Sequence, residues 1–123
     1  MSPGRQIRVE IKPGVILWPA HFHSYYPGLI LRAVEFAWPT ESDLIVITRG
    51  AEPVPTGAPN SRHLWGEAFD FRTKHLPPEV DRGALIEKIM NGSLLGKDYY
   101  GYFRITPDGG DGFIEWMHIQ HNR

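Results

Sequence analysis

Two β-prone runs near the C-terminus constrain the fold of this chain more than any other feature. Residues 99–106 (YYGYFRIT) and 113–120 (FIEWMHIQ) are rich in aromatic and β-branched side chains, which are enriched in strands. The six residues between them, PDGGDG, are typical turn formers. We therefore expect an antiparallel hairpin here, and a sheet that is mainly antiparallel.

Two other stretches have the features of helices. The segment from about Pro27 to Trp38 has apolar residues at helical spacing, and Pro39 is expected to end it. A second helix is expected after Pro77-Pro78, with the Asn91-Gly92 pair as its stop.

Three shorter runs complete the expected sheet. The run LIVIT at 44–48 is apolar throughout, which is typical of a buried central strand. The others are IRVEI at 7–11 and EAFDF at 67–71. The predicted fold class is α+β: a small, mainly antiparallel sheet with two principal helices, in a single domain over 1–123.

Composition narrows the classes of function. The net charge is −1 and the 13 Lys and Arg are scattered, so a nucleic-acid partner is not expected. There is no cysteine, so a transition-metal site must use His, Asp or Glu. The chain has neither an apolar run of ~18 residues nor the apolar core of a signal peptide. We expect a monomer, made in the cytoplasm without a signal peptide and without a membrane partner.

The segment SRHLWGEAFD at 61–70 brings together residue types used in metal sites. His63 and Asp70 are seven residues apart, which on one unbroken strand would separate them by roughly 23 Å. Gly66 lies between them and is the natural place for a bend. Ala68 shares a strand face with Asp70 and leaves room for a ligand above the acid.

A second cluster, EWMH at 115–118, supplies the remaining groups. Catalytic zinc sites use three protein ligands and keep one position for water, and a further carboxylate accepts the proton of that water. His63, Asp70 and His118 would serve as the ligands, with Glu115 as the base. The sequence therefore predicts a hydrolytic Zn²⁺ site.

These residues match a known pattern. SRHLWGEAFD fits the S-x-H-x-x-G-x-A-x-D signature of the D-alanyl-D-alanine carboxypeptidase family of zinc peptidases, and EWMH fits its second element, E-x-x-H. The chain thus resembles a family that includes bacterial D,D-carboxypeptidases, D,D-dipeptidases and phage L-alanyl-D-glutamate endolysins. That family shares a fold with the signalling domain of Hedgehog proteins, and the resemblance implies the same fold here.

The resemblance implies zinc at His63, Asp70 and His118, and Glu115 as catalytic base. It further implies an arginine that holds substrate or the oxyanion, for which Arg49 is the nearest match, although the serine-rich surroundings of that arginine in relatives are absent. The implied substrate is a peptidoglycan stem peptide, cleaved by an endolysin-type endopeptidase or a D,D-carboxypeptidase. The enzyme would act on the cell wall after its release from the cytoplasm.

Three alternatives remain open at this stage. The chain could be a zinc-stabilised binding module of the same fold that has lost catalysis. It could instead be a cytosolic D-Ala-D-Ala dipeptidase, or an amidohydrolase that acts on an unrelated small amide. Retention of Glu115 at the base position weighs against the binding module.

Overall fold

The C-terminal hairpin forms as its sequence predicts. In the computed structural model, which describes residues 6–17, 25–50, 68–92 and 95–121, β4 (Tyr99–Pro107) pairs antiparallel with β5 (Phe113–His121) over the full length of both strands. Gly109 in the turn has φ +92°, a conformation that glycine adopts readily. The Asp108 carboxylate accepts a hydrogen bond from the Gly110 amide at 2.8 Å and fixes the turn.

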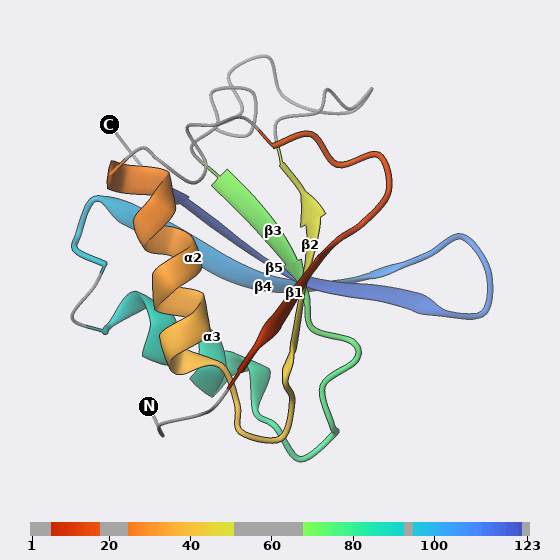
Figure 1. Cartoon of the computed structure of the whole chain (residues 1–123). Helices are drawn as coiled ribbons and strands as arrows, with labels where there is room; N and C mark the ends of the chain where they lie inside the picture. The colour runs from red at the N-terminus through yellow and green to blue at the C-terminus, as the bar shows by residue number, and fades with distance from the viewer. Residues whose placement is uncertain (1–5, 18–24, 51–67, 93–94, 122–123) are drawn as a thin grey trace.

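Three shorter strands extend the sheet beyond the hairpin (Figure 1). They are β1 (Arg8–Ile11), β2 (Leu44–Arg49) and β3 (Ala68–Arg72). The strand order is β1-β2-β3-β5-β4. Only the β1–β2 pairing is parallel, and the other three are antiparallel. The sheet is mixed, and the predicted α+β class with a mainly antiparallel sheet and two helices is confirmed at this level.

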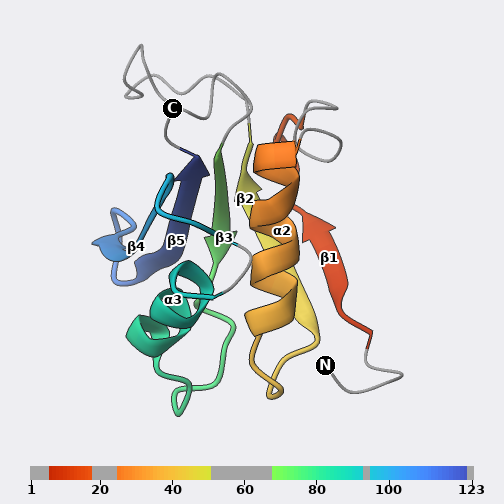
Figure 2. The same cartoon turned by 90° about the vertical axis from the view of Figure 1, so that its left-hand side faces the viewer.

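Helix α2 (Tyr25–Ala37) connects the two parallel strands and packs on one face of the sheet. Its buried residues recur at helical spacing and end in a tryptophan just beyond the last turn: Ile30, Ala33, Val34, Ala37 and Trp38. This is the apolar stripe that the sequence predicts. Figure 2 shows α2 lying over the face of the sheet in front of β2.

Helix α3 (Arg82–Met90) packs on the same side of the sheet, against β4. Asp81 caps it, since its carboxylate accepts a hydrogen bond from the Ala84 amide at 3.0 Å. A Cβ added at Gly101 of β4 would lie 2.8 Å from Met90 Sδ. The helix therefore approaches the sheet closely because position 101 has no side chain. Within the described ranges, no helix is long and apolar enough to span a membrane.

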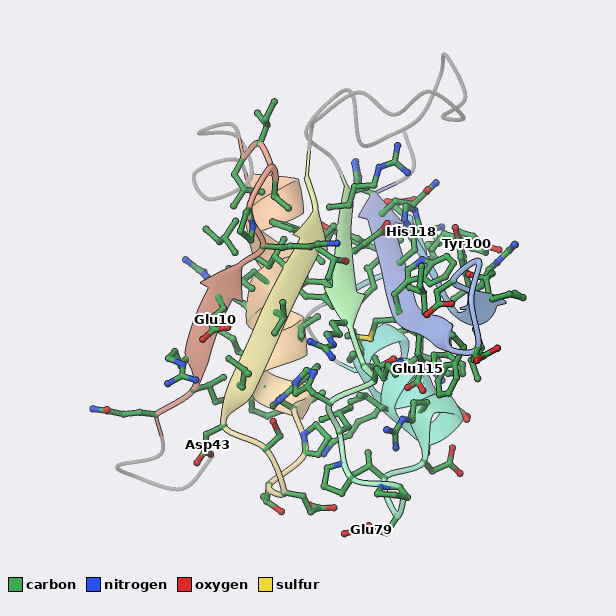
Figure 3. The ribbon with its side chains drawn as sticks, turned by 90° about the vertical axis from the view of Figure 1, so that its right-hand side faces the viewer. Glu10, Asp43, Glu79, Tyr100, Glu115 and His118 are labelled. Carbon is green, nitrogen blue, oxygen red and sulfur yellow. The ribbon has the colours of Figure 1, made fainter. Side chains whose placement is uncertain are left out.

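The two faces of the sheet differ in character. Side chains alternate along each strand, and one set forms the core beneath the helices: Ile45, Ile47, Phe69, Phe71, Met117 and Ile119. The alternate set of β2, β3 and β5 points to the opposite side, which we call the open face. Figure 3 views the sheet from this side, with the strands in front of the helices.

Candidate metal site

Asp70 and His118 lie side by side at the centre of the open face. They are register partners on β3 and β5, and Asp70 Oδ1 is 2.7 Å from His118 Nδ1. Only 7% of Asp70 and 5% of His118 is exposed. A buried carboxylate needs a compensating partner, and the imidazole provides one. The structure thus unites two of the three ligands that the sequence predicts.

The other ring nitrogen of His118 is also engaged. Nε2 lies 2.7 Å from Gln120 Oε1, so the atoms facing both nitrogens are acceptors as placed. A neutral imidazole has one N–H only. A ring whose N–H is at Nδ1 satisfies both contacts when the Gln120 amide is turned to donate to Nε2. The Asp70–His118 contact then contains a hydrogen-bonded proton in the position that a shared metal ion would take.

The two facing atoms of this pair lie closer together than two ligands of one zinc ion. Ligand atoms at ~2.1 Å from a tetrahedral zinc lie roughly 3.4 Å apart, so Asp70 Oδ1 and His118 Nδ1 need to separate by less than about 1 Å from their 2.7 Å contact. His63, the third predicted ligand, and Gly66 lie outside the described residues. Within the described ranges, no three His, Asp or Glu side chains come together as a metal-binding group.

Arg49 joins the pair through an irregularity in β2. Its register partner is Asp70, whereas Ile47 pairs with Phe71, so β2 carries an extra residue between these pairs. Regular alternation would place Arg49 on the core side with Ile47. The bulge turns it to the open face instead, as bulges beside functional sites often do. Arg49 Nε is buried and has no hydrogen-bond partner among the described residues.

Tyr102 completes this row of residues on β4. It is the register partner of His118, and the two rings stack with centroids 5.0 Å apart. Burial raises the pKa of the Tyr102 phenol, and the Asp70 carboxylate raises it further. The hydroxyl therefore remains a proton donor at neutral pH. The sequence analysis did not single out this residue, although the predicted hairpin indicated its neighbourhood to His118.

Glu115 is placed differently from the two ligands. It is three residues before His118 in a strand with no register shift, so the two side chains point to opposite faces. Glu115 is 8% exposed, and its Oε1 accepts a hydrogen bond from Arg82 Nε at 2.9 Å in an ion pair. The predicted base is thus bound to a cation on the helix side of β5.

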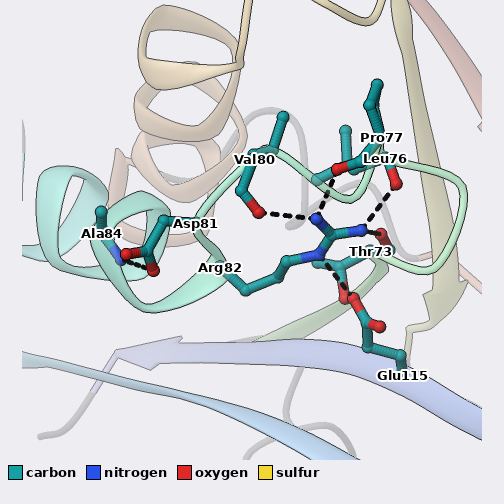
Figure 4. A network of polar contacts seen from close by, with 8 residues as sticks. All are labelled: Thr73, Leu76, Pro77, Val80, Asp81, Arg82, Ala84 and Glu115. Carbon is teal, nitrogen blue, oxygen red and sulfur yellow. Dashed lines mark hydrogen bonds and ion pairs between the residues drawn. The ribbon is translucent and has the colours of Figure 1, made fainter.

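Arg82 is a structural centre that the sequence analysis missed (Figure 4). Besides Glu115, its guanidinium donates to four backbone carbonyls, those of Thr73, Leu76, Pro77 and Val80. These five bonds use all five N–H groups of the side chain. A cation in the first turn of a helix is disfavoured by the helix dipole. The position of Arg82 was therefore the one sequence feature that could have indicated a special role for this side chain. Arg82 fixes the segment between β3 and α3.

A groove of about 900 Å³ runs over the open face. Leu44, Val46 and Thr48 of β2 line it, together with Arg49 and Asp70. The end of β1 and the hairpin near Trp116 border it on either side. Its size is typical of sites that bind small molecules or short peptides. Asp70 thus lies in the lining of a groove large enough for such a ligand.

Comparisons of the chain with protein-family models, with curated proteins and with solved structures found no match.

Proposed function

We propose that this protein is a zinc-dependent peptidase that cleaves a peptide bond in peptidoglycan stem peptides. One observation carries the proposal: a buried Asp70–His118 pair lies at 2.7 Å on the open face of the sheet, and the groove passes over Asp70. A buried carboxylate–imidazole pair that lies outside the apolar core and beside a groove is a candidate functional site. Metal binding accounts for both their burial and their position.

The roles follow from the chemistry of each side chain. Asp70 and His118 would hold the ion together with His63, whose inclusion rests on the motif. A zinc ion bound there would supply Lewis-acid polarisation and lower the pKa of its water. Arg49 projects a guanidinium beside this centre, where it can stabilise an oxyanion or a substrate carboxylate. The Tyr102 hydroxyl is a further neutral donor on the same face.

Glu115 is the proposed base on the strength of the E-x-x-H motif. Glu115 lies on a strand that is paired on both sides, with Ile105 of β4 and with the Thr73 amide, so acting as base on the open face requires a local rearrangement of β5 as well as release from Arg82. Glu115 also borders the groove. The ion pair with Arg82 is the observation that favours the second candidate, a zinc-stabilised binding module in which Glu115 is structural.

The finer fold assignment is also part of this proposal. A two-helix layer on one face of a small mixed sheet, with the ligand pair on the other face, is compatible with the Hedgehog/D,D-peptidase fold. We propose that the chain acts as a monomer on the cell wall after its release from the cytoplasm. A cytosolic D-Ala-D-Ala dipeptidase would use the same centre on a shorter substrate.

The full chain should release peptide fragments or free amino acids from purified peptidoglycan. We expect this activity to disappear with a chelator and to return when Zn²⁺ is added in slight excess, since the zinc-bound water is the nucleophile in such sites. Mass spectrometry of the products identifies the bond cleaved. Binding to peptidoglycan without hydrolysis would support the binding module and reject the peptidase.

Arg49→Lys should lower kcat/KM on a defined stem peptide by at least about tenfold, because an ammonium cannot reproduce the two-pronged geometry of a guanidinium. Arg49 Nε has no hydrogen-bond partner among the described residues, so the melting temperature should change little. The measurement pairs steady-state kinetics with thermal unfolding. Unchanged kinetics with a lower melting temperature would make Arg49 a structural residue and leave the zinc argument intact.

A further inference from the structure

The carboxylates that border the groove already have basic partners. Among the described residues, these pairs are Glu10 with Arg8 at 3.3 Å, Glu115 with Arg82 at 2.9 Å, and Asp70 with His118 at 2.7 Å. The other charged side chains described in the groove lining are cationic: Lys12, Arg49, Arg72 and Lys74. The groove therefore has excess positive charge, although the whole chain has a net charge of −1.

Arg72 is the cation of this group that is best placed to bind a ligand. It lies two residues after Asp70 on β3, so both side chains are on the open face. The Arg72 side chain is exposed and makes no hydrogen bond or ion pair with another described residue. Lys74, by contrast, already donates to the Phe113 carbonyl at 2.8 Å and lies over the Phe113 ring.

The neighbours of Arg72 indicate the chemistry of the ligand. Its register partner on β5 is Trp116, a half-buried aromatic side chain that also borders the groove. Arg49 pairs with Asp70, the open-face residue that precedes Arg72 on β3. Two guanidinium groups and an indole next to Asp70 match a short peptide that carries carboxylates and apolar side chains.

We propose that Arg72, with Trp116 beside it, is a carboxylate-binding subsite that selects acidic peptides. The inference rests on the proposed function, because it places the substrate in the groove next to the Asp70–His118 pair. Arg72 acts on substrate binding and not on the reacting bond. It therefore sets which stem peptides are accepted, with a preference for those whose glutamate or C-terminal carboxyl group is free.

The test measures binding separately from hydrolysis. The metal-free full chain is titrated calorimetrically with a stem pentapeptide ending in D-Ala-D-Ala, and with two analogues that carry an amide at the D-Glu carboxyl or at the C-terminus. We expect one amide to bind roughly tenfold more weakly than the acid, as for the loss of one charge-assisted hydrogen-bonded pair in a partly exposed site. That amide identifies the carboxylate that Arg72 contacts.

In Arg72→Gln the peptide with the free acid should bind only as tightly as its amide, so the preference should disappear. Arg72→Lys should retain part of it, because a point charge still attracts the carboxylate. The matched control is Arg32→Gln, which removes an exposed arginine on α2 and should leave the preference unchanged. Circular dichroism verifies that each variant is folded.

Equal affinities for the acid and both amides, a preference that survives in Arg72→Gln, or no measurable binding of any peptide would overturn the subsite. Each of these results leaves the peptidoglycan assay to decide the proposed function. Conversely, a preference that depends on Arg72 in a protein that hydrolyses nothing would establish the subsite and reject the peptidase.

Discussion

Replacing His118 with Ala is expected to remove most of the bound zinc and to lower hydrolysis by more than about 10³-fold, because a three-ligand site loses both a ligand and its geometry. The loss of zinc should result from the missing ligand and not from unfolding of the protein. His118 contacts Asp70, Gln120 and the ring of Tyr102, all on the open face and apart from the core beneath the helices. Zinc per folded chain is measured by elemental analysis after dialysis, and His63→Ala should behave in the same way.

His75→Ala is the matched control for this variant. His75 Nε2 interacts with the Leu44 carbonyl at 2.8 Å and the ring stacks on Trp38, so its loss should reduce stability and leave zinc content unchanged. Full zinc occupancy in His118→Ala would reject the assignment of the metal site. Zinc loss in both variants to the same degree would point to a general effect of unfolding.

Glu115→Gln should lower kcat by at least about 10²-fold, the scale expected for loss of a general base. A glutamine keeps an oxygen that can accept the hydrogen bond from Arg82 Nε. The fold should therefore persist, with zinc content near that of the unmodified chain. The measurements are single-turnover hydrolysis, zinc content and thermal unfolding on the same preparation.

Two further variants separate the base from the structural role. Glu87→Gln changes an exposed glutamate on α3 and should alter neither activity nor stability. Arg82→Lys removes most of the five hydrogen bonds of the guanidinium and should lower the melting temperature sharply. If Glu115→Gln loses stability and keeps its turnover, Glu115 is a partner of Arg82 only, and the binding module becomes the better proposal.

The fold was largely predictable because its signals are local. The PDGGDG turn fixes the hairpin, and the spacing of Ile30 and Val34 fixes the buried face of α2. The apolar run at 44–48 forms an interior strand of the sheet, as its composition predicts. The pairing register of the hairpin was harder to predict from the sequence. A turn centred on 107–112 would pair His118 with Gly101, whereas the structure pairs it with Tyr102.

The candidate site was predictable only in part, because its assembly depends on long-range pairing. Asp70 and His118 could be named from the motif, and their contact follows from the β3–β5 register. The Arg82–Glu115 pair could not be predicted from the sequence. It joins residues 33 positions apart through a loop whose carbonyl groups converge on one guanidinium, and no periodicity in the sequence encodes that convergence. His63 lies outside the described residues and stays a prediction.

The bulge in β2 makes the chemistry of the open face a matter of residue count as well as residue type. Strand side chains obey a parity rule, and one extra residue before Arg49 changes its parity relative to Ile47. In a regular strand with the same number of residues, Arg49 would pair with Phe69 and direct its guanidinium toward the apolar core, whereas deletion of one residue before it would restore regular alternation and keep the arginine opposite Asp70. A one-residue deletion between Ile47 and Arg49 should thus keep the arginine on the open face, and relatives of this chain can reach the same placement with or without the bulge.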